Sequence, residues 1–169
     1  QLAMLKLREQ ARRTLAVAVP GGAQLVDCWL QSLPFRLTRA QQRVVDEVGQ
    51  DMSSQLPMMR LVQGDVGSGK TVIAAQACLQ VVAAGHQATV MAPTEILAEQ
   101  HYWTFVNWLE PLGIRVAWLS GKQGAKERRE MSEAVQSGYA HIAVGTHALF
   151  QKDIEFHDLA LVVVDEQHR

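Results

Sequence analysis

The sequence of 169 residues is 48% hydrophobic and 20% charged, and its 17 acidic and 16 basic side chains leave a formal charge of -1. This composition is typical of one ordinary globular domain and excludes collagen-like, disordered and miniprotein classes. A chain of this length buries roughly 70% of the surface that its unfolded form exposes, so its core needs neither disulfides nor a structural metal. Because the net charge is close to zero, any binding to nucleic acid must come from local groups.

Apolar stretches are short. The run at 159–164 is far below the ~20 residues that span a bilayer, and no charged and apolar leader opens the chain. We therefore expect a cytoplasmic protein without a membrane partner. The two cysteines, Cys28 and Cys78, lack metal-ligand spacing and have apolar neighbours, which predicts reduced thiols that serve in packing.

The N-terminal third predicts helices. Residues 1–18 have apolar positions at roughly helical spacing, and the Pro20-Gly21-Gly22 turn ends the pattern. A short helix is predicted at 27–33, where Pro34 ends it. A further amphipathic helix is predicted to follow Thr38, which is a good N-cap residue.

From Met58 onward, short apolar runs alternate with helical stretches. The predicted strands are 60–63, 88–92, 116–119, 141–144 and 159–164, and the predicted helices are 71–84, 94–109 and 126–136. Continuous apolar runs are typical of strands that are buried on both faces, and intervening helices imply parallel crossovers. The pattern predicts an α/β fold with a doubly wound, mostly parallel sheet and helices on both faces.

One glycine-rich segment has the spacing GxxxxGK[ST] of a phosphate-binding loop. It consists of Gly64, Asp65, Val66, Gly67, Ser68, Gly69, Lys70 and Thr71. The predicted strand before it and the predicted helix after it are the context that this motif requires. Its glycines permit positive φ and a close approach of backbone N–H groups to phosphate oxygens. Lys70 then supplies a charge to the outer phosphates, and Thr71 offers its hydroxyl to Mg²⁺.

Two carboxylates follow the last predicted strand. Asp165 and Glu166 come directly after the apolar run 161–164, and ligands of open α/β sheets bind at the carboxyl ends of strands. Asp165 is therefore expected to hold Mg²⁺, and Glu166 to polarise the water that attacks the γ-phosphate. A solvated turn is the alternative interpretation of two adjacent acids, but the phosphate loop makes the catalytic interpretation the better one.

These acids also carry a family resemblance. Asp165-Glu166-Gln167-His168 is the form of motif II found in a subset of superfamily 2 helicases, and the segments 64–71, 91–101 and 145–150 agree with other motifs of that superfamily. Residues 33–169 resemble the first motor domain of its ATP-dependent DNA helicases that act on branched DNA. The resemblance implies a RecA-like P-loop NTPase fold, with ATP and Mg²⁺ as cofactors. It also implies that Gln167 and His168 couple the nucleotide site to the DNA site.

The resemblance assigns DNA contacts to two further motifs. Pro93 and Thr94 correspond to motif Ia, Gly145 and Thr146 correspond to motif Ib, and His147 is a weaker candidate beside them. Small and hydroxyl side chains at strand-to-helix turns leave backbone N–H groups for phosphate oxygens. The alternative role for Thr94 is helix capping, which can coexist with DNA binding.

The segment around Phe35 and Gln41 resembles the Q motif, which recognises adenine in such helicases. The Gln41 amide matches the N6 and N7 edge of adenine, and Phe35 offers a stacking face. Against this, an amphipathic helix after Thr38 would place glutamines on its polar face in any case.

Other conspicuous residues have simpler interpretations. The basic residues between Lys122 and Arg129 are interleaved with glutamates, which is typical of a solvated helix face. Trp103, Trp108 and Trp118 are expected to pack in the core or between helices.

Members of the resembled family are much longer, so we expect two regions here. Residues 1–33 would be a connecting helical segment from an N-terminal wedge region, and residues 34–169 would be the first RecA-like motor domain, truncated after motif II. The expected partners are branched DNA, the wedge domain and a second RecA-like domain. Three alternatives stay open: a double-strand DNA translocase of the transcription-repair coupling type, a P-loop kinase of small substrates, and a nucleotide-binding module without turnover.

Overall fold

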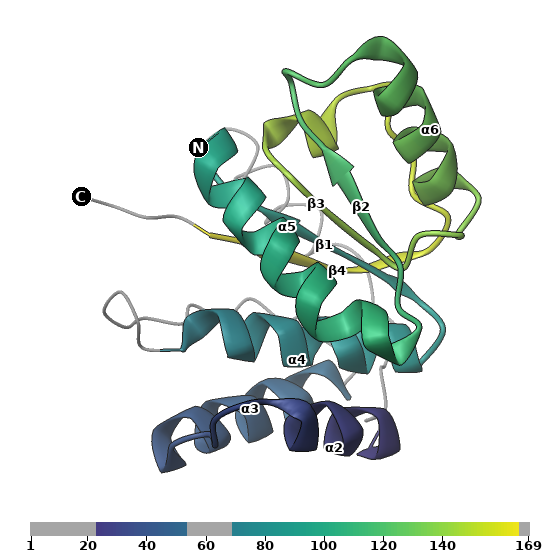
Figure 1. Ribbon diagram of the computed structural model, residues 1–169. Helices are drawn as coiled ribbons and strands as arrows, with labels where there is room; N and C mark the ends of the chain where they lie inside the picture. The colour runs from purple at the N-terminus through teal and green to yellow at the C-terminus, as the bar shows by residue number, and fades with distance from the viewer. Residues whose placement is uncertain (1–22, 54–68, 166–169) are drawn as a thin grey trace.

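The computed structural model describes residues 23–53 and 69–165 (Figure 1). The predicted helix at 1–18 and the predicted strand at 60–63 lie outside the described residues. In chain order, the elements are α2 (Ala23–Ser32), α3 (Arg39–Met52), α4 (Lys70–Ala83), β1 (Gln87–Met91), α5 (Glu95–Leu109), η1 (Glu110–Leu112), β2 (Val116–Leu119), α6 (Ala125–Gln136), β3 (Ile142–Gly145), η2 (His147–Phe150) and β4 (Leu159–Val164).

The four described strands form one parallel sheet in the order β2-β3-β1-β4. Met91 at the end of β1 pairs with Gly145 of β3 and with Val164 of β4. The chain leaves β1 for the far edge through α5 and returns through α6, which is the doubly wound pattern. The α/β fold class predicted from the alternating elements is therefore confirmed.

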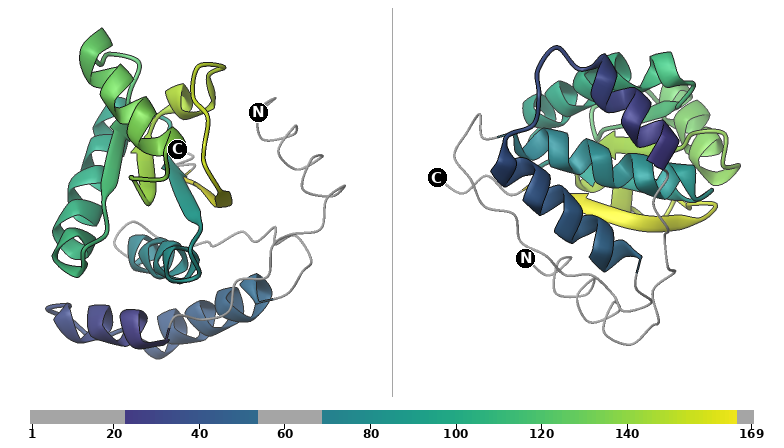
Figure 2. Two further views of the ribbon diagram at one scale, coloured as in Figure 1. Left: turned by 90° about the vertical axis from the view of Figure 1, so that its right-hand side faces the viewer. Right: turned by 90° about the horizontal axis from the view of Figure 1, so that it is seen from below.

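Helices cover both faces of the sheet, and alternate strand residues point to each face. One face packs on α4 and α5, and its buried side chains include Ala88, Val90, Val116, Ile142, Val144 and Leu161. The other face packs on α6 and η2 through Ala117, Leu119, Ala143, Val135 and Leu149. Figure 2 shows α5 and η2 on opposite sides of the strands.

Helices α2 and α3 form a further layer on the side of α4 that faces away from the sheet (Figure 1). Thr38 caps α3 through a capping box: its hydroxyl accepts from the Gln41 N–H, and the Gln41 side chain accepts from the Thr38 N–H. The predicted cap is therefore confirmed. Helix α2 begins at Ala23, four residues before the predicted start at 27. Asp27, the first residue of the predicted helix, therefore lies inside it.

The tryptophans divide between core and surface. Trp29 is fully buried, and its ring lies 5.9 Å from that of Trp108, while Trp118 lies 5.5 Å from Tyr102. Trp103 is 54% exposed, so the expectation that it packs in the core was wrong. Its helix is apolar on several faces, and aromatic character alone does not specify which face is covered. Among residues 23–53 and 69–165, no helix is long and apolar enough to cross a membrane.

The two cysteines should differ strongly in reactivity. Cys78 is fully buried in α4, and burial raises the pKa of its thiol to about 12, whereas Cys28 is exposed. Because the thiolate is the reactive form, Cys28 should react and Cys78 should not. Titration of the native 169-residue chain with a thiol reagent should count one fast thiol, and two after denaturation. Equal rates for both thiols in the native chain would contradict this packing.

Candidate functional site

The carboxyl ends of the four described strands lie at one edge of the sheet because the sheet is parallel. Three hydrogen bonds extend the ladder beyond this edge: Asp165 N–H donates to the Met91 carbonyl (2.8 Å), Ala92 N–H to Gly145 (3.0 Å) and Thr146 N–H to Leu119 (3.3 Å). The turns that follow the strands are therefore held side by side. This edge brings together the predicted motifs Ia and Ib and the first carboxylate of motif II.

The end of the predicted phosphate loop opens α4. Gly69 is left-handed, with φ 84°, and Lys70 and Thr71 form the first turn of the helix. A helix N-terminus presents free backbone N–H groups to anions. This N-terminus and the carboxyl end of β4 lie on the same side of the molecule (Figure 1). Residues 64–68 of the loop lie outside the described residues.

Gln41 lies directly against the loop. A Cβ added to Gly69 would come within 1.7 Å of the Gln41 Nε2, so the amide occupies the space over this glycine. The Gln41 oxygen accepts from the Thr38 N–H at 2.8 Å. Phe35 is 42% exposed and contacts Trp108 edge-on at 6.3 Å. Adenine recognition by both residues stays a prediction, and Phe35 has an observed packing role besides.

Replacing Gly69 by Ala should disturb this arrangement. A left-handed backbone costs an L residue about 1–2 kcal/mol, and the new methyl group must displace the Gln41 amide. We expect the free energy of unfolding to fall by about 1–2 kcal/mol, measured by denaturant titration. ADP should also bind more weakly, measured by titration with fluorescent ADP. Gly124→Ala is the matched control, because Gly124 has φ -64° and open space around it. Equal losses of stability and ADP affinity in Gly69→Ala and Gly124→Ala would contradict the left-handed conformation of Gly69 and its contact with Gln41.

Asp165 has a partner that the sequence analysis did not single out. His101 Nε2 lies 2.7 Å from Asp165 Oδ2, and the two side chains are 16% and 22% exposed. Helical spacing in the sequence could have indicated this position. His101 lies three residues after Ala98 and four before Phe105, and both of these residues are fully buried, so His101 occupies the inner face of α5. The other predicted residues of motif II, Glu166, Gln167 and His168, lie outside the described residues.

Motif Ia forms the turn between β1 and α5. Pro93 and Thr94 are exposed, and the Thr94 hydroxyl accepts from the Leu97 N–H at 3.3 Å, so the capping role is confirmed. The Ser120 hydroxyl donates to the Glu95 carboxylate and ties the start of α5 to the end of β2. The exposure of Pro93 and Thr94 leaves them accessible to DNA, and that contact stays a prediction.

Motif Ib is more enclosed than expected. A Cβ on Gly145 would lie 1.8 Å from the Leu119 carbonyl, so only glycine fits there. Thr146 is 2% exposed, its N–H is used by Leu119, and its hydroxyl accepts from the Ala148 N–H as the cap of η2. The Thr146 N–H is therefore not free for a phosphate oxygen in this structure. His147 is exposed at the same turn and is the more accessible group for the predicted DNA contact.

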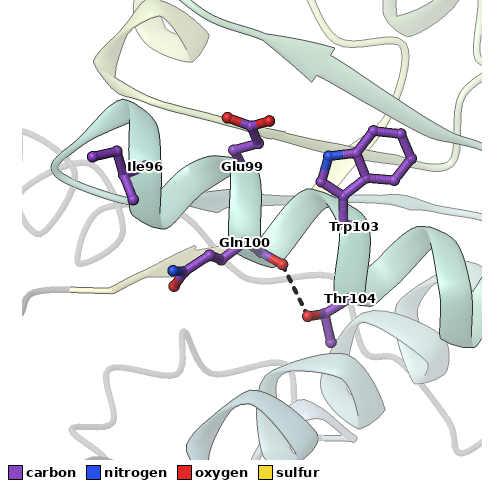
Figure 3. Close-up of a pocket in the computed structure, with 5 residues that line it drawn as sticks. All are labelled: Ile96, Glu99, Gln100, Trp103 and Thr104. Carbon is purple, nitrogen blue, oxygen red and sulfur yellow. Dashed lines mark hydrogen bonds between the residues drawn. The ribbon is translucent and has the colours of Figure 1, made fainter.

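Two other surface features lie on α5 and α6. A shallow pocket on α5 is lined by Ile96, Glu99, Gln100, Trp103 and Thr104 (Figure 3). All five belong to one helix face, where the Thr104 hydroxyl donates to the Gln100 carbonyl at 2.9 Å, and none is a predicted nucleotide or DNA residue. In the predicted basic run, Arg128 donates to Asp153 at 3.0 Å, and this bond lowers the pKa of the Asp153 carboxyl.

Comparison with known proteins gives close relatives. The chain is 54% identical over 168 residues to the ATP-dependent DNA helicase RecG of Escherichia coli O157:H7, and 44% identical over 169 residues to RecG of Aquifex aeolicus. These alignments cover 99% and 100% of this chain but 24% and 21% of those proteins. The chain thus spans about a quarter of the length of the curated relatives it matches. Similarity to RecG is what the four sequence motifs predicted.

Solved structures agree with the fold. The structure of RecG bound to a three-way DNA junction matches 99% of this chain and 23% of that chain, with 42% identity and a TM-score of 0.87. A hypothetical ATP-dependent RNA helicase from Sulfolobus tokodaii matches at 21% identity with a TM-score of 0.65, which supports the fold alone. The family model of DEAD/DEAH box helicases matches residues 38–169, which include the phosphate loop, the capped helix α5 and Asp165. The chain therefore belongs to the DEAD/DEAH box helicase family.

Proposed function

We propose that this chain is the first RecA-like motor domain of an ATP-dependent DNA helicase that acts in the cytoplasm on branched DNA, such as replication forks and Holliday junctions, in recombination and repair. The observation that carries the proposal is the shared edge of the sheet, where Asp165 and the turns of motifs Ia and Ib are joined by hydrogen bonds. A motor needs its nucleotide and DNA contacts on connected elements. The 54% identity to RecG supports the choice of branched DNA.

The described residues fit a magnesium nucleotide. Lys70 and Thr71 open α4 and Asp165 follows β4, and these two element ends lie on the same side of the molecule. Hydroxyl and carboxylate oxygens are the ligands that Mg²⁺ prefers, and the bound ion would neutralise phosphate charge. Lys70 would hold the outer phosphates, Asp165 and Thr71 would hold the ion, and Glu166 would orient the attacking water. We assign the coupling of nucleotide to DNA to Gln167 and His168.

The division of the chain is part of the same proposal. Residues 34–169 would form the motor domain, and residues 1–33 would connect it to a wedge domain that grips the junction. The family match at 38–169 supports the first boundary to within a few residues. Helix α2, which falls in the connecting region, packs on α4 of the proposed motor domain. A second RecA-like domain would complete the nucleotide site.

Strand release from a three-way junction tests this function in the full-length protein. We expect ATP-dependent release of the branch strands, and none by Lys70→Ala, because the ammonium donors to the outer phosphates are lost. Lys70→Ala should still bind the junction in a gel-shift assay, which separates DNA binding from nucleotide use. Strand release by Lys70→Ala equal to that of the parent, or none by the parent, would contradict the proposal.

Gln41 should set the choice of base. Gln41→Ala removes the amide beside Gly69, so the preference for ATP over GTP should fall while phosphate binding by Lys70 remains. The substitution also removes half of the capping box, so unfolding must be measured alongside. Competition of ATP and GTP against fluorescent ADP gives the ratio directly. An unchanged ATP preference would leave Gln41 with a capping role only.

A further inference from the structure

The contact between His101 and Asp165 joins two motifs that have been assigned different ligands. His101 lies in the helix that follows Pro93 and Thr94, and Asp165 is the first carboxylate after β4, 64 residues further on. In the tautomer that carries its proton on Nε2, His101 donates to Asp165 Oδ2. The bond uses one carboxylate oxygen and leaves Oδ1 for another partner.

Neighbouring backbone and helix contacts fix the positions of both His101 and Asp165. The backbone N–H of Asp165 donates to Met91 at 2.8 Å, which fixes where β4 delivers the carboxylate. His101 is held by its helix, because Ala98 and Phe105 on the same face are fully buried. Glu95 at the start of α5 is tied to Ser120. A rotation of α5 would therefore move His101, which is the hydrogen-bond partner of the Asp165 carboxylate.

We propose that His101 is a positioning residue for Asp165: it fixes the orientation of the carboxylate that holds the nucleotide's Mg²⁺ and links that carboxylate to the motif Ia helix. The inference rests on the proposed function, since it requires a magnesium nucleotide at this edge. Groups that orient metal ligands from behind typically account for about 10–100-fold in metal affinity. His101 itself touches neither the nucleotide nor the metal in this proposal.

A second histidine pair provides the control. His86 Nδ1 lies 2.6 Å from Asp158 Oδ2, with side chains 19% and 45% exposed. These residues precede β1 and β4, so the pair lies at the amino edge of the same two strands, opposite the nucleotide site. Removing His86 breaks an equally short bond in the same sheet without touching the carboxyl edge.

The experiment measures how much Mg²⁺ is needed to tighten ADP binding by the full-length protein. Fluorescent ADP is titrated in EDTA and at increasing Mg²⁺, for the parent, His101→Leu, His101→Gln and His86→Leu. We expect His101→Leu to raise the half-saturating Mg²⁺ concentration about 10–100-fold while ADP binding in EDTA is unchanged. Because a glutamine amide can donate from near the Nε2 position, His101→Gln should restore most of the loss, and His86→Leu should match the parent.

Other results would contradict either the positioning role of His101 or the proposed function. An unchanged Mg²⁺ requirement in His101→Leu overturns the positioning role and leaves the proposed function intact. Loss of ADP binding in EDTA by His101→Leu, or an equal defect in His86→Leu, shows that the histidine only supports the fold and also overturns it. A parent protein whose ADP affinity does not respond to Mg²⁺ contradicts the proposed function itself, and the positioning role with it.

Discussion

The 169-residue chain on its own should bind ATP or ADP with Mg²⁺ but hydrolyse ATP hardly at all. In two-domain motors an arginine from the second domain stabilises the charge that develops on the transferred phosphoryl group. Such an arginine is worth roughly 10³- to 10⁵-fold in rate in related phosphoryl transfers. The chain covers 24% of its relative in Escherichia coli O157:H7, and we propose that the second domain lies in the remainder of such a protein.

Calorimetry with ADP and a phosphate-release assay with and without DNA test this expectation. Binding without turnover is the expected pair of results. The full-length protein is the positive control, and its Lys70→Ala variant gives the background. Robust DNA-stimulated hydrolysis by the 169-residue chain alone would show that the site is complete without a second domain.

Replacing Glu166 by Gln should stop hydrolysis while ATP stays bound. The amide keeps the size and reach of the carboxylate but cannot act as the base that orients and polarises water. Loss of a general base costs about 10²- to 10⁴-fold in rate, roughly 3–5 kcal/mol of barrier. A neutral amide near phosphates should not weaken ground-state binding. In the full-length protein, this variant should bind branched DNA and ATP and fail to unwind.

Asp165→Asn is the contrasting variant. It removes charge from the carboxylate that we assign to Mg²⁺ and from the acceptor of the His101 bond. Nucleotide affinity and its dependence on Mg²⁺ should therefore fall together. Equilibrium nucleotide titration and steady-state hydrolysis on both variants separate the two roles. An equal loss of nucleotide affinity in Glu166→Gln and Asp165→Asn would contradict the assignment of Mg²⁺ binding to Asp165 and water activation to Glu166.

Local chemistry explains what could be predicted from the sequence. The strands at 116–119 and 159–164 were located to the residue because continuous apolar runs are buried on both faces of a parallel sheet. The caps at Thr38 and Thr94 were correct because capping depends on a hydroxyl and a backbone N–H three residues apart. The start of α2 was placed four residues too late, because the prediction rested on the apolar positions of the second half of the helix.

Tertiary contacts account for what sequence reasoning missed. The bond between His101 and Asp165 joins residues 64 positions apart, and only the packing of α5 against the sheet brings them together. The use of the Thr146 N–H by Leu119 has the same origin, because it depends on how closely β2 and β3 approach at Gly145. The exposure of Trp103 depends on which face of α5 the sheet covers. The phosphate loop before Gly69 and the end of motif II remain predictions from the motifs themselves.

Steady-state ATP hydrolysis by the full-length protein, compared on two DNA substrates, tests the central proposal most directly. A three-way junction and a linear duplex of equal length and base composition are supplied at the same salt concentration, because phosphate contacts make binding strongly salt-dependent. We expect the junction to stimulate hydrolysis much more than the linear duplex does. Equal stimulation by the two substrates would instead indicate a translocase on linear duplex and would contradict a helicase specialised for branched DNA.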